Sequence, residues 1–157
     1  MKREHAMTQS AQTGDTPLGH FPGEERFFAV RDEEVQWHPS PLLPPEVRMA
    51  VLVGDPAKAA PYLIRVRVPN NARIPPHKHR EDRIYTVMSG VFYIGLGDTF
   101  DETKLMGFAP GSVVVLPADQ AHFHWVKSGE YISQISAFGP IGSTYLNPAD
   151  DPRATRA

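Results

Sequence analysis

Apolar residues in this chain fall into short runs with the two-residue period of β-strands, and no long segment has the 3.6-residue period of an amphipathic helix. The clearest run is the segment 62–68, in which Ile64 and Val66 alternate with Arg65 and Arg67. Such alternation predicts a strand with one face in the core and one face in water. The chain is therefore expected to form β-sheets.

Turn-forming glycine, proline and asparagine residues separate these runs. Many short strands joined by such turns predict an all-β fold, an antiparallel sandwich or barrel of the jelly-roll type. One turn of helix is expected at Asp101–Lys104. The strands are expected over 25–31, 35–38, 47–53, 62–68, 84–88, 91–96, 105–108, 112–116, 121–126 and 131–138, with an edge strand within 139–145.

The 157 residues are enough for one domain with its own core. Residues 1–20 are polar and aperiodic, which predicts a flexible N-terminal arm. Residues 21–146 are expected to form a single barrel domain, and residues 147–157 a polar C-terminal tail. The chain carries no internal repeat.

Composition narrows the classes of partner and cofactor. A net charge of −2 offers no electrostatic basis for binding nucleic acid or an anionic membrane. The chain has no cysteine, so disulfides are excluded and any metal must be held by histidine or carboxylate. No apolar run is long enough for a membrane span, and the first residues lack the apolar core of a signal peptide. A cytoplasmic location is expected.

Two stretches of the sequence place histidines two residues apart. His77 and His79 follow a proline pair, and His122 and His124 follow Pro117 and a polar turn. Side chains at positions i and i+2 of a strand point to the same face. Neutral imidazole is a common ligand of divalent transition metals. We therefore expect the two strands to line one barrel and to share a metal ion.

The first stretch has the spacing of a known motif: glycine, five residues, His-x-His, three or four residues, glutamate, six residues, glycine. Here Asn71 stands at the first glycine, His77 and His79 match, Arg83 occupies the glutamate position, and Gly90 matches the last glycine. Asparagine tolerates a left-handed backbone better than most residues, so its presence at a glycine position is a mild departure. Arg83 is a larger departure, because it replaces an acidic ligand by a cation.

The second stretch fits a companion motif: glycine, five residues, Pro-x-Gly, two residues, histidine, three residues, asparagine. Gly111, Pro117 and His122 match, while Asp119 replaces the glycine and Val126 the asparagine. With both motifs present at about residues 60–138, the chain resembles the cupin superfamily.

The resemblance implies a cupin-type jelly-roll β-barrel, often a homodimer, with a divalent metal ion held inside by three histidines and usually a glutamate. Carried over to this sequence, the ligands are His77, His79 and His122. The glutamate ligand has no counterpart. In this respect the chain is similar to cupins of the diketone-cleaving dioxygenase kind, which use histidines alone.

Several neighbouring residues are further candidates. His124 shares the face of His122 and is a candidate fourth ligand, proton shuttle or pocket residue. Glu81 has the strand parity of the first pair and is a candidate replacement for the missing carboxylate. Arg83 either clamps a substrate carboxylate or pairs with an acidic neighbour at the barrel rim. Tyr93 and Gln134 are candidate substrate-binding residues in the cavity.

These observations favour a metal-dependent, dioxygenase-like oxidoreductase acting on a small organic molecule, with Fe(II) preferred and zinc, manganese, nickel or copper as other candidates. One alternative is a zinc-dependent lyase, hydrolase or isomerase, because three histidines and a water suit zinc. Another is a non-catalytic barrel that binds or senses a metal or a small ligand. The substrate itself is not encoded in any motif.

Overall fold

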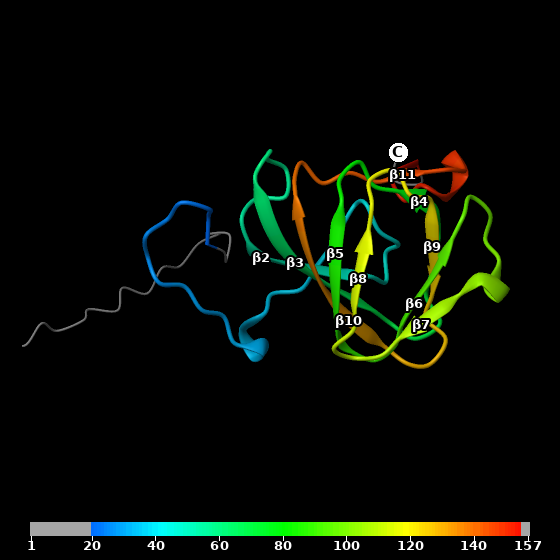
Figure 1. Ribbon diagram of the computed structural model, residues 1–157, viewed down its shortest axis with the longest axis horizontal. Helices are drawn as coiled ribbons and strands as arrows, with labels where there is room; N and C mark the ends of the chain where they lie inside the picture. Colours follow the sequence, from blue (N-terminus) through cyan, green and yellow to red (C-terminus); the bar gives the residue numbers. More distant parts are fainter. Residues whose placement is uncertain (1–19, 155–157) are drawn as a thin grey trace, which may run out of the picture.

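A computed structural model describes residues 20–154, so the arm expected over 1–20 lies outside the described residues except for His20. Two antiparallel sheets face each other and form a jelly-roll barrel, as predicted (Figure 1). No helix within residues 20–154 has the length and apolar character needed to cross a bilayer.

The first sheet has the strand order β1-β2-β3-β10-β5-β8, and the second has the order β11-β4-β9-β6-β7. Within residues 20–154 there are also three short 3-10 helices, one before β1, one between β6 and β7 and one after β11. The first sheet is formed by β1 (His38–Pro39), β2 (Arg48–Val53), β3 (Pro61–Val68), β10 (Tyr131–Phe138), β5 (Arg83–Ser89) and β8 (Val113–Leu116). The second is formed by β11 (Thr144–Tyr145), β4 (Arg73–Lys78), β9 (His122–Trp125), β6 (Phe92–Leu96) and β7 (Met106–Phe108), and the helices are η1 (Asp32–Glu34), η2 (Glu102–Lys104) and η3 (Pro148–Asp150).

The expected strands from residue 47 onward are present within a few residues of the predicted bounds, and η2 is the expected helical turn. The strand expected over 25–31 is wrong: none of these residues is in a strand, the segment has no strand partner among residues 20–154, and Phe27 is 92% exposed. Of the strand expected over 35–38, only His38 is in a strand, β1, which continues to Pro39. An apolar alternation predicts a strand only where a neighbouring strand offers its free backbone groups, and none of the described strands lies beside 25–31.

The core lies between the two sheets. It is built from the inward positions of β3 (Ile64, Val66 and Val68), which are fully or nearly buried, together with aromatic rings of β5 and β6. Tyr85 and Phe92 stack with their ring centroids 5.2 Å apart. The alternation seen in 62–68 therefore marks the core face correctly.

The two motif positions where another residue replaces glycine keep the backbone of glycine. Asn71 has φ 67° and Asp119 has φ 61°, both in the left-handed region. Asparagine and aspartate are the side chains that tolerate this region best, so both turns are retained without glycine.

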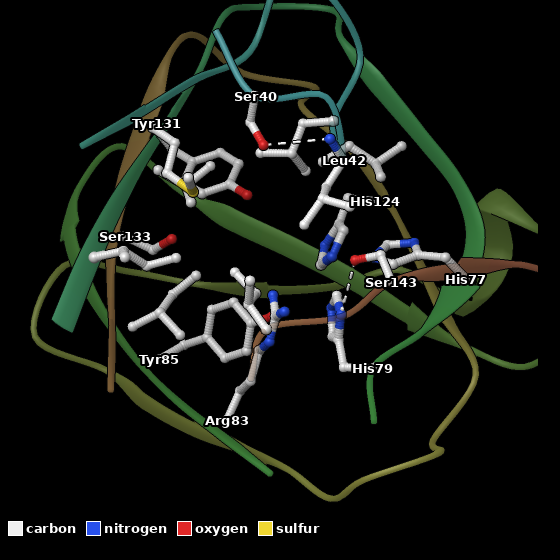
Figure 2. Close-up of a pocket in the computed structure, with 17 residues that line it drawn as sticks. Ser40, Leu42, His77, His79, Arg83, Tyr85, His124, Tyr131, Ser133 and Ser143 are labelled. Atoms are coloured by element: carbon white, nitrogen blue, oxygen red, sulfur yellow. Dashed lines mark hydrogen bonds between the residues drawn. The ribbon is translucent and has the colours of Figure 1, made fainter. Parts of the chain in front are cut away.

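A small cavity remains between the sheets, with a volume of about 30 Å³. Histidines line one side and tyrosines and Ser133 another, while Ser40 and Leu42 of the loop after β1 lie at its upper edge (Figure 2). The hydroxyl of Tyr145 in β11 donates to the carbonyl of Leu42 at 2.9 Å, which fixes this loop to the second sheet. The volume is enough for an ion and one or two water molecules.

The tail expected over 147–157 is described as far as residue 154. It contains η3, and the Arg153 guanidinium donates to the carbonyl of Ser143 at 3.0 Å. The segment thus packs beside β11, close to the histidine side of the cavity.

Gly90 offers a test of the turn that ends the first motif. It has φ +69°, and a Cβ added there would lie 2.2 Å from the carbonyl oxygen of Glu130. We expect Gly90→Ala to lower the free energy of unfolding by about 2–4 kcal/mol, from backbone strain and overpacking together. Urea denaturation measures the change.

The matched control is Gly111→Ala. Gly111 has φ +88° and no atom within 4 Å of an added Cβ, so only the backbone term of about 1–2 kcal/mol applies. An equal fall in the free energy of unfolding of the two variants would show that the close approach to Glu130 does not contribute to the effect of Gly90→Ala.

Candidate metal centre

His77 reaches the cavity because β4 contains a bulge. The register of β4 against β9 shifts between Ile74 and His77, at the proline pair Pro75-Pro76. Proline has no backbone N–H to give to a ladder, so a bulge is the natural place for it in a strand. The His77 Nδ1 lies 2.8 Å from the carbonyl oxygen of Pro75, so the bulge also holds the ring.

His79 follows the end of β4 and is held by the segment before β11. Its Nδ1 lies 2.9 Å from the carbonyl oxygen of Gly142 and 3.1 Å from the hydroxyl of Ser143. The ring is buried, with 3% of the residue exposed. Its direction therefore depends on the backbone of residues 142 and 143.

His122 and His124 both point inward from β9, as the i, i+2 spacing predicts. The Nδ1 of His122 lies 2.9 Å from the carbonyl oxygen of Gln120, and the Nδ1 of His124 lies 2.9 Å from that of Tyr93. Phe123, between them, packs on the opposite face against the ring of Phe100. The alternation of β9 is thus the predicted one.

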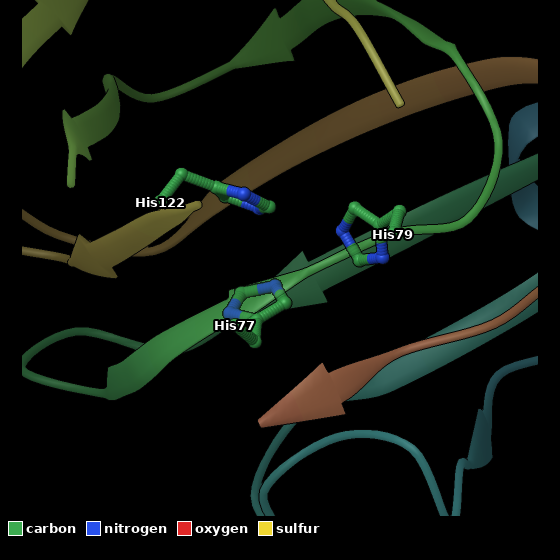
Figure 3. Close-up of side chains that lie close together, drawn as sticks. All are labelled: His77, His79 and His122. Carbon is green, nitrogen blue, oxygen red and sulfur yellow. The ribbon is translucent and has the colours of Figure 1, made fainter. Parts of the chain in front are cut away.

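His77, His79 and His122 form one cluster, shown in Figure 3. One ring nitrogen of each lies within 4.8 Å of those of the other two. The ring centroids of His77 and His122 are 4.2 Å apart, and each is 4.9 Å from that of His79. The ring of His124 is 5.1 Å from that of His122 but is not part of the cluster.

The hydrogen bonds determine which nitrogen of each ring is available. A carbonyl oxygen accepts only, so each Nδ1 that lies against one must carry the proton. The Nε2 atoms then have free lone pairs, which is the tautomer that metal ligation requires. His122 Nε2 is fully buried and has no hydrogen-bond partner among residues 20–154.

The rings are neutral at physiological pH. Burial, followed by the proximity of the other histidines, holds the pKa of His77 well below its usual range. Burial and the Arg83 guanidinium lower the pKa of His79 to about 2. Burial lowers the pKa of His122 to about 4 and that of His124 to about 3. Protons therefore compete weakly for these nitrogens.

Glu81 is not in the cluster, because its carboxylate is fully used elsewhere. Oε1 accepts from the Tyr62 hydroxyl at 3.0 Å and from Arg83 Nε at 2.9 Å, and Oε2 accepts from the backbone N–H of Gly142 at 3.2 Å. The carbonyl of Gly142 is the partner of His79. Glu81 thus supports a histidine through the backbone of one residue, Gly142, and is not part of the histidine cluster.

Arg83 pairs with Glu81, which was one of the two alternatives for it, but the pair is inside the barrel and not at the rim. Only 7% of the Arg83 side chain and 6% of the Glu81 side chain are exposed. Because Nε and Nη2 both donate to Glu81, this edge of the guanidinium is not available for a bidentate bond to a substrate carboxylate.

The structure does not place Tyr93 and Gln134 in the cavity. The Tyr93 hydroxyl lies 3.2 Å from that of Ser128 on the outer face, and Gln134 accepts from Arg65 at 3.1 Å on the outer face of β10. The residues that line the cavity include five that the sequence analysis does not single out: Tyr85, Tyr131, Ser133, Ile135 and Ser143.

These residues fit a divalent metal ion. Three lone pairs converge, each ring is held by a backbone carbonyl, and a buried nitrogen has no other partner. The cluster could therefore hold a metal ion, as the sequence predicts. Imidazole ligands alone do not select its identity, because zinc, copper, nickel and iron all accept them.

Comparison with known proteins supports the fold. No protein-family model and no curated protein sequence matches the chain. The polyketide cyclase RemF from Streptomyces resistomycificus has a similar structure, with a TM-score of 0.63 at 19% identity over 84% of this chain and 94% of that one. The DMSP lyase DddQ from Ruegeria pomeroyi gives a TM-score of 0.57 at 16% identity, over 70% of this chain and 60% of that one.

A cupin 2 conserved barrel domain protein from Rhodopseudomonas palustris gives a TM-score of 0.52 at 18% identity, over 67% of this chain and 69% of that one. These likenesses show that the chain has the cupin fold, which confirms the expectation from its two motifs. One fold supports many reactions, so the site and not the fold must carry the function.

The buried pair gives a prediction about the support of His79. In Glu81→Gln the charge partner of Arg83 is lost, and an amide cannot accept at both positions. We expect the free energy of unfolding to fall by about 3–5 kcal/mol, because a buried charge is left unpaired. We also expect Zn²⁺ affinity to fall by roughly 10–100-fold. Urea denaturation and competition with a chelating dye measure the two effects.

Glu130→Gln is the matched control, because Glu130 pairs with Arg67 at 3.0 Å on the surface. Its loss should cost less than about 1 kcal/mol and leave metal affinity unchanged. Adding Arg83→Met to Glu81→Gln should restore stability but not metal affinity. Unaltered metal affinity in Glu81→Gln would show that the backbone of Gly142 does not need this carboxylate to hold His79.

The neutral rings give a second prediction. The unfolded histidines have pKa values of about 6.5, while the folded rings of His79, His122 and His124 have values of about 2 to 4. As pH falls below 6.5 the unfolded chain therefore binds protons first, and metal-free protein loses stability by about 1.4 kcal/mol per histidine for each further pH unit.

Denaturant melts between pH 7.5 and 5 measure this slope. His124→Gln keeps a donor for the Tyr93 carbonyl but removes one titrating ring, so it should reduce the slope by one histidine's share. A wild-type stability that stays constant from pH 7 to 5 would contradict the neutral burial of these rings.

Proposed function

We propose that this protein is a metal-dependent enzyme that acts on a small organic molecule inside the barrel, with His77, His79 and His122 as the ligands of one divalent ion. The observation that carries the proposal is the convergence of three buried imidazoles whose Nδ1 protons are all held by backbone carbonyls. Three protein ligands leave positions open for substrate, which is the usual arrangement of catalytic sites.

The ligand set favours chemistry without net oxidation. Iron oxygenases commonly combine two histidines with a carboxylate, and the carboxylate nearest in sequence, Glu81, is held by Arg83, Tyr62 and Gly142. Three neutral histidines are instead typical of catalytic zinc. A bound zinc ion would supply Lewis acidity and a water with a pKa near 7. The names cyclase and lyase of RemF and DddQ agree with such chemistry.

The protein's own residues supply orientation and protons. Burial raises the pKa values of Tyr85 and Tyr131, so both hydroxyls keep their protons at neutral pH and can donate hydrogen bonds. Ile64, Val66 and Ile135 form apolar walls of the cavity. A polar group that reacts between them is surrounded by a low dielectric, where each hydrogen bond is stronger than in water.

A dioxygenase-like reaction with Fe(II) is the second candidate. The same open positions and apolar walls suit the binding of dioxygen, and imidazole is also a ligand of iron. A non-catalytic, metal-binding barrel shares the ligands but predicts no turnover.

Metal binding is tested first. We expect purified protein to bind one equivalent of Zn²⁺ or another divalent ion per chain, measured by elemental analysis after dialysis. His79→Ala should weaken the affinity by more than the roughly 10–100-fold loss typical of an outer-shell partner, while the far-UV spectrum of the strands stays unchanged. His38→Ala, at an exposed position of β1, is the control. Full occupancy in His79→Ala would refute the ligand assignment.

Turnover separates the candidates. Zinc-loaded and anaerobically iron-loaded protein are incubated with small diketones, hydroxyketones, phenols and thiols, with and without oxygen. Product formed by the zinc protein without oxygen consumption supports the Lewis-acid reaction. Oxygen uptake by the iron protein alone supports the dioxygenase. Metal bound without turnover in any arm favours the non-catalytic barrel.

A further inference from the structure

Ser133 is a buried polar residue without a structural explanation. Only 1% of the residue is exposed, and its hydroxyl has no hydrogen-bond partner among residues 20–154. In this part of the chain, the only other fully buried side-chain nitrogen or oxygen without a partner is Nε2 of His122, a proposed metal ligand. An unsatisfied buried hydroxyl costs about 1–3 kcal/mol, so its presence needs a reason.

The hydroxyl of Ser133 faces the same cavity as the histidines. Ser133 lines the cavity from β10, and Figure 2 shows its oxygen and that of Tyr131 directed inward, across from His77 and His79. The walls between the two sides are mostly apolar, and Arg83 is the charged residue among them. The cavity therefore has a polar end that can bind a metal and a second polar end formed by hydroxyl groups.

The cavity carries no free charge apart from a metal. The histidines are neutral, and the charge of Arg83 is balanced by Glu81 within the wall. A ligand that brings a carboxylate or an ammonium group to the hydroxyl end would have to be desolvated without a partner. The second end therefore suits an uncharged group that accepts or donates a hydrogen bond.

The small volume limits the ligand further. About 30 Å³ is free beneath Leu42 and Leu43, so a ligand has a short skeleton or displaces this loop. Either way, the wall between the two polar ends is mostly apolar, and the one guanidinium in it, that of Arg83, is already paired with Glu81.

We infer that Ser133 is a specificity-determining residue of the proposed enzyme. Its hydroxyl binds the end of the substrate that lies away from the metal, and it selects small uncharged molecules with two oxygen functions, such as hydroxyketones, diketones or enols. The inference rests on the proposed function, because it takes the histidine cluster as the site of the first oxygen.

The experiment uses Co²⁺-loaded protein, whose thiolate charge-transfer absorption reports binding at the metal. Two matched pairs of probes are titrated: ethanethiol against 2-mercaptoethanol, and propanethiol against 3-mercaptopropanol. Both members of a pair bind the metal through their sulfur. Only the hydroxythiol also carries a hydroxyl group that can reach Ser133. The quantity compared is the affinity ratio of hydroxythiol to alkanethiol.

For at least one pair, we expect Ser133→Ala to lower this ratio by about 5–10-fold, the effect of one hydrogen bond. Metal affinity should not change. The metal-free variant should be as stable as wild type or more stable, because an unpaired hydroxyl is removed. A purely structural serine would instead make Ser133→Ala less stable.

Ser136→Ala, on the exposed outer face of the same strand, is the control and should leave the ratio at its wild-type value. If Co²⁺ binds and both ratios are unchanged in Ser133→Ala, the inference about Ser133 is wrong and the metal site stands. If wild-type protein binds no Co²⁺, the proposed function and this inference fall together.

Discussion

The candidate site depends on one type of interaction, the hydrogen bond from an imidazole Nδ1 to a backbone carbonyl. The four carbonyls belong to Pro75, Tyr93, Gln120 and Gly142, which lie in four different segments of the chain. Each ring is therefore aimed by backbone that is itself fixed by the sheets. The histidines can converge only after both sheets have closed around them, so the site is a property of the complete barrel.

This dependence has an energetic consequence. Four neutral imidazoles packed together stabilise the fold little through contacts with one another. Their burial lowers their pKa values, so they do not accept protons at neutral pH. Glu81 and Arg83 carry opposite charges into the same wall, but the pair neutralises itself and takes no part in ligation. Exchanging the glutamate of the motif for an arginine thus changes the charge of the ligand set and not the position of the histidines. The three histidines lie together without a carboxylate in their cluster.

The sequence predicts the sheets well because alternation in 62–68 and the histidine pairs reports directly which side chains face the core. The segment 25–31 shows the limit, since a strand also needs a neighbour, and no local pattern encodes one. The pairing of Glu81 with Arg83 follows from their i, i+2 spacing. Its burial does not, because it requires Tyr62 and Gly142 from distant segments.

The apolar pattern along β10 does not predict which of its residues line the far side of the cavity. Along β10 the apolar residues Ile132 and Ile135 have opposite parity, so alternation does not say whether Ser133 or Gln134 faces inward. The register of β10 against β5 shifts between Ile132 and Ser133, which resolves the conflict in three dimensions.

The irregularities of this fold lie beside its chemistry. A bulge at a proline pair turns His77 inward, and a register shift occurs where Ser133 enters the cavity. Regular strands alone would satisfy every backbone group and bury only apolar side chains, which is the more stable arrangement. Among the described residues, the two fully buried polar side-chain atoms left without partners belong to His122 and Ser133, in the histidine cluster and at the far side of the adjoining cavity. Because stability alone would remove both, their joint presence is most simply explained by a bound ion and a bound molecule that satisfy them together.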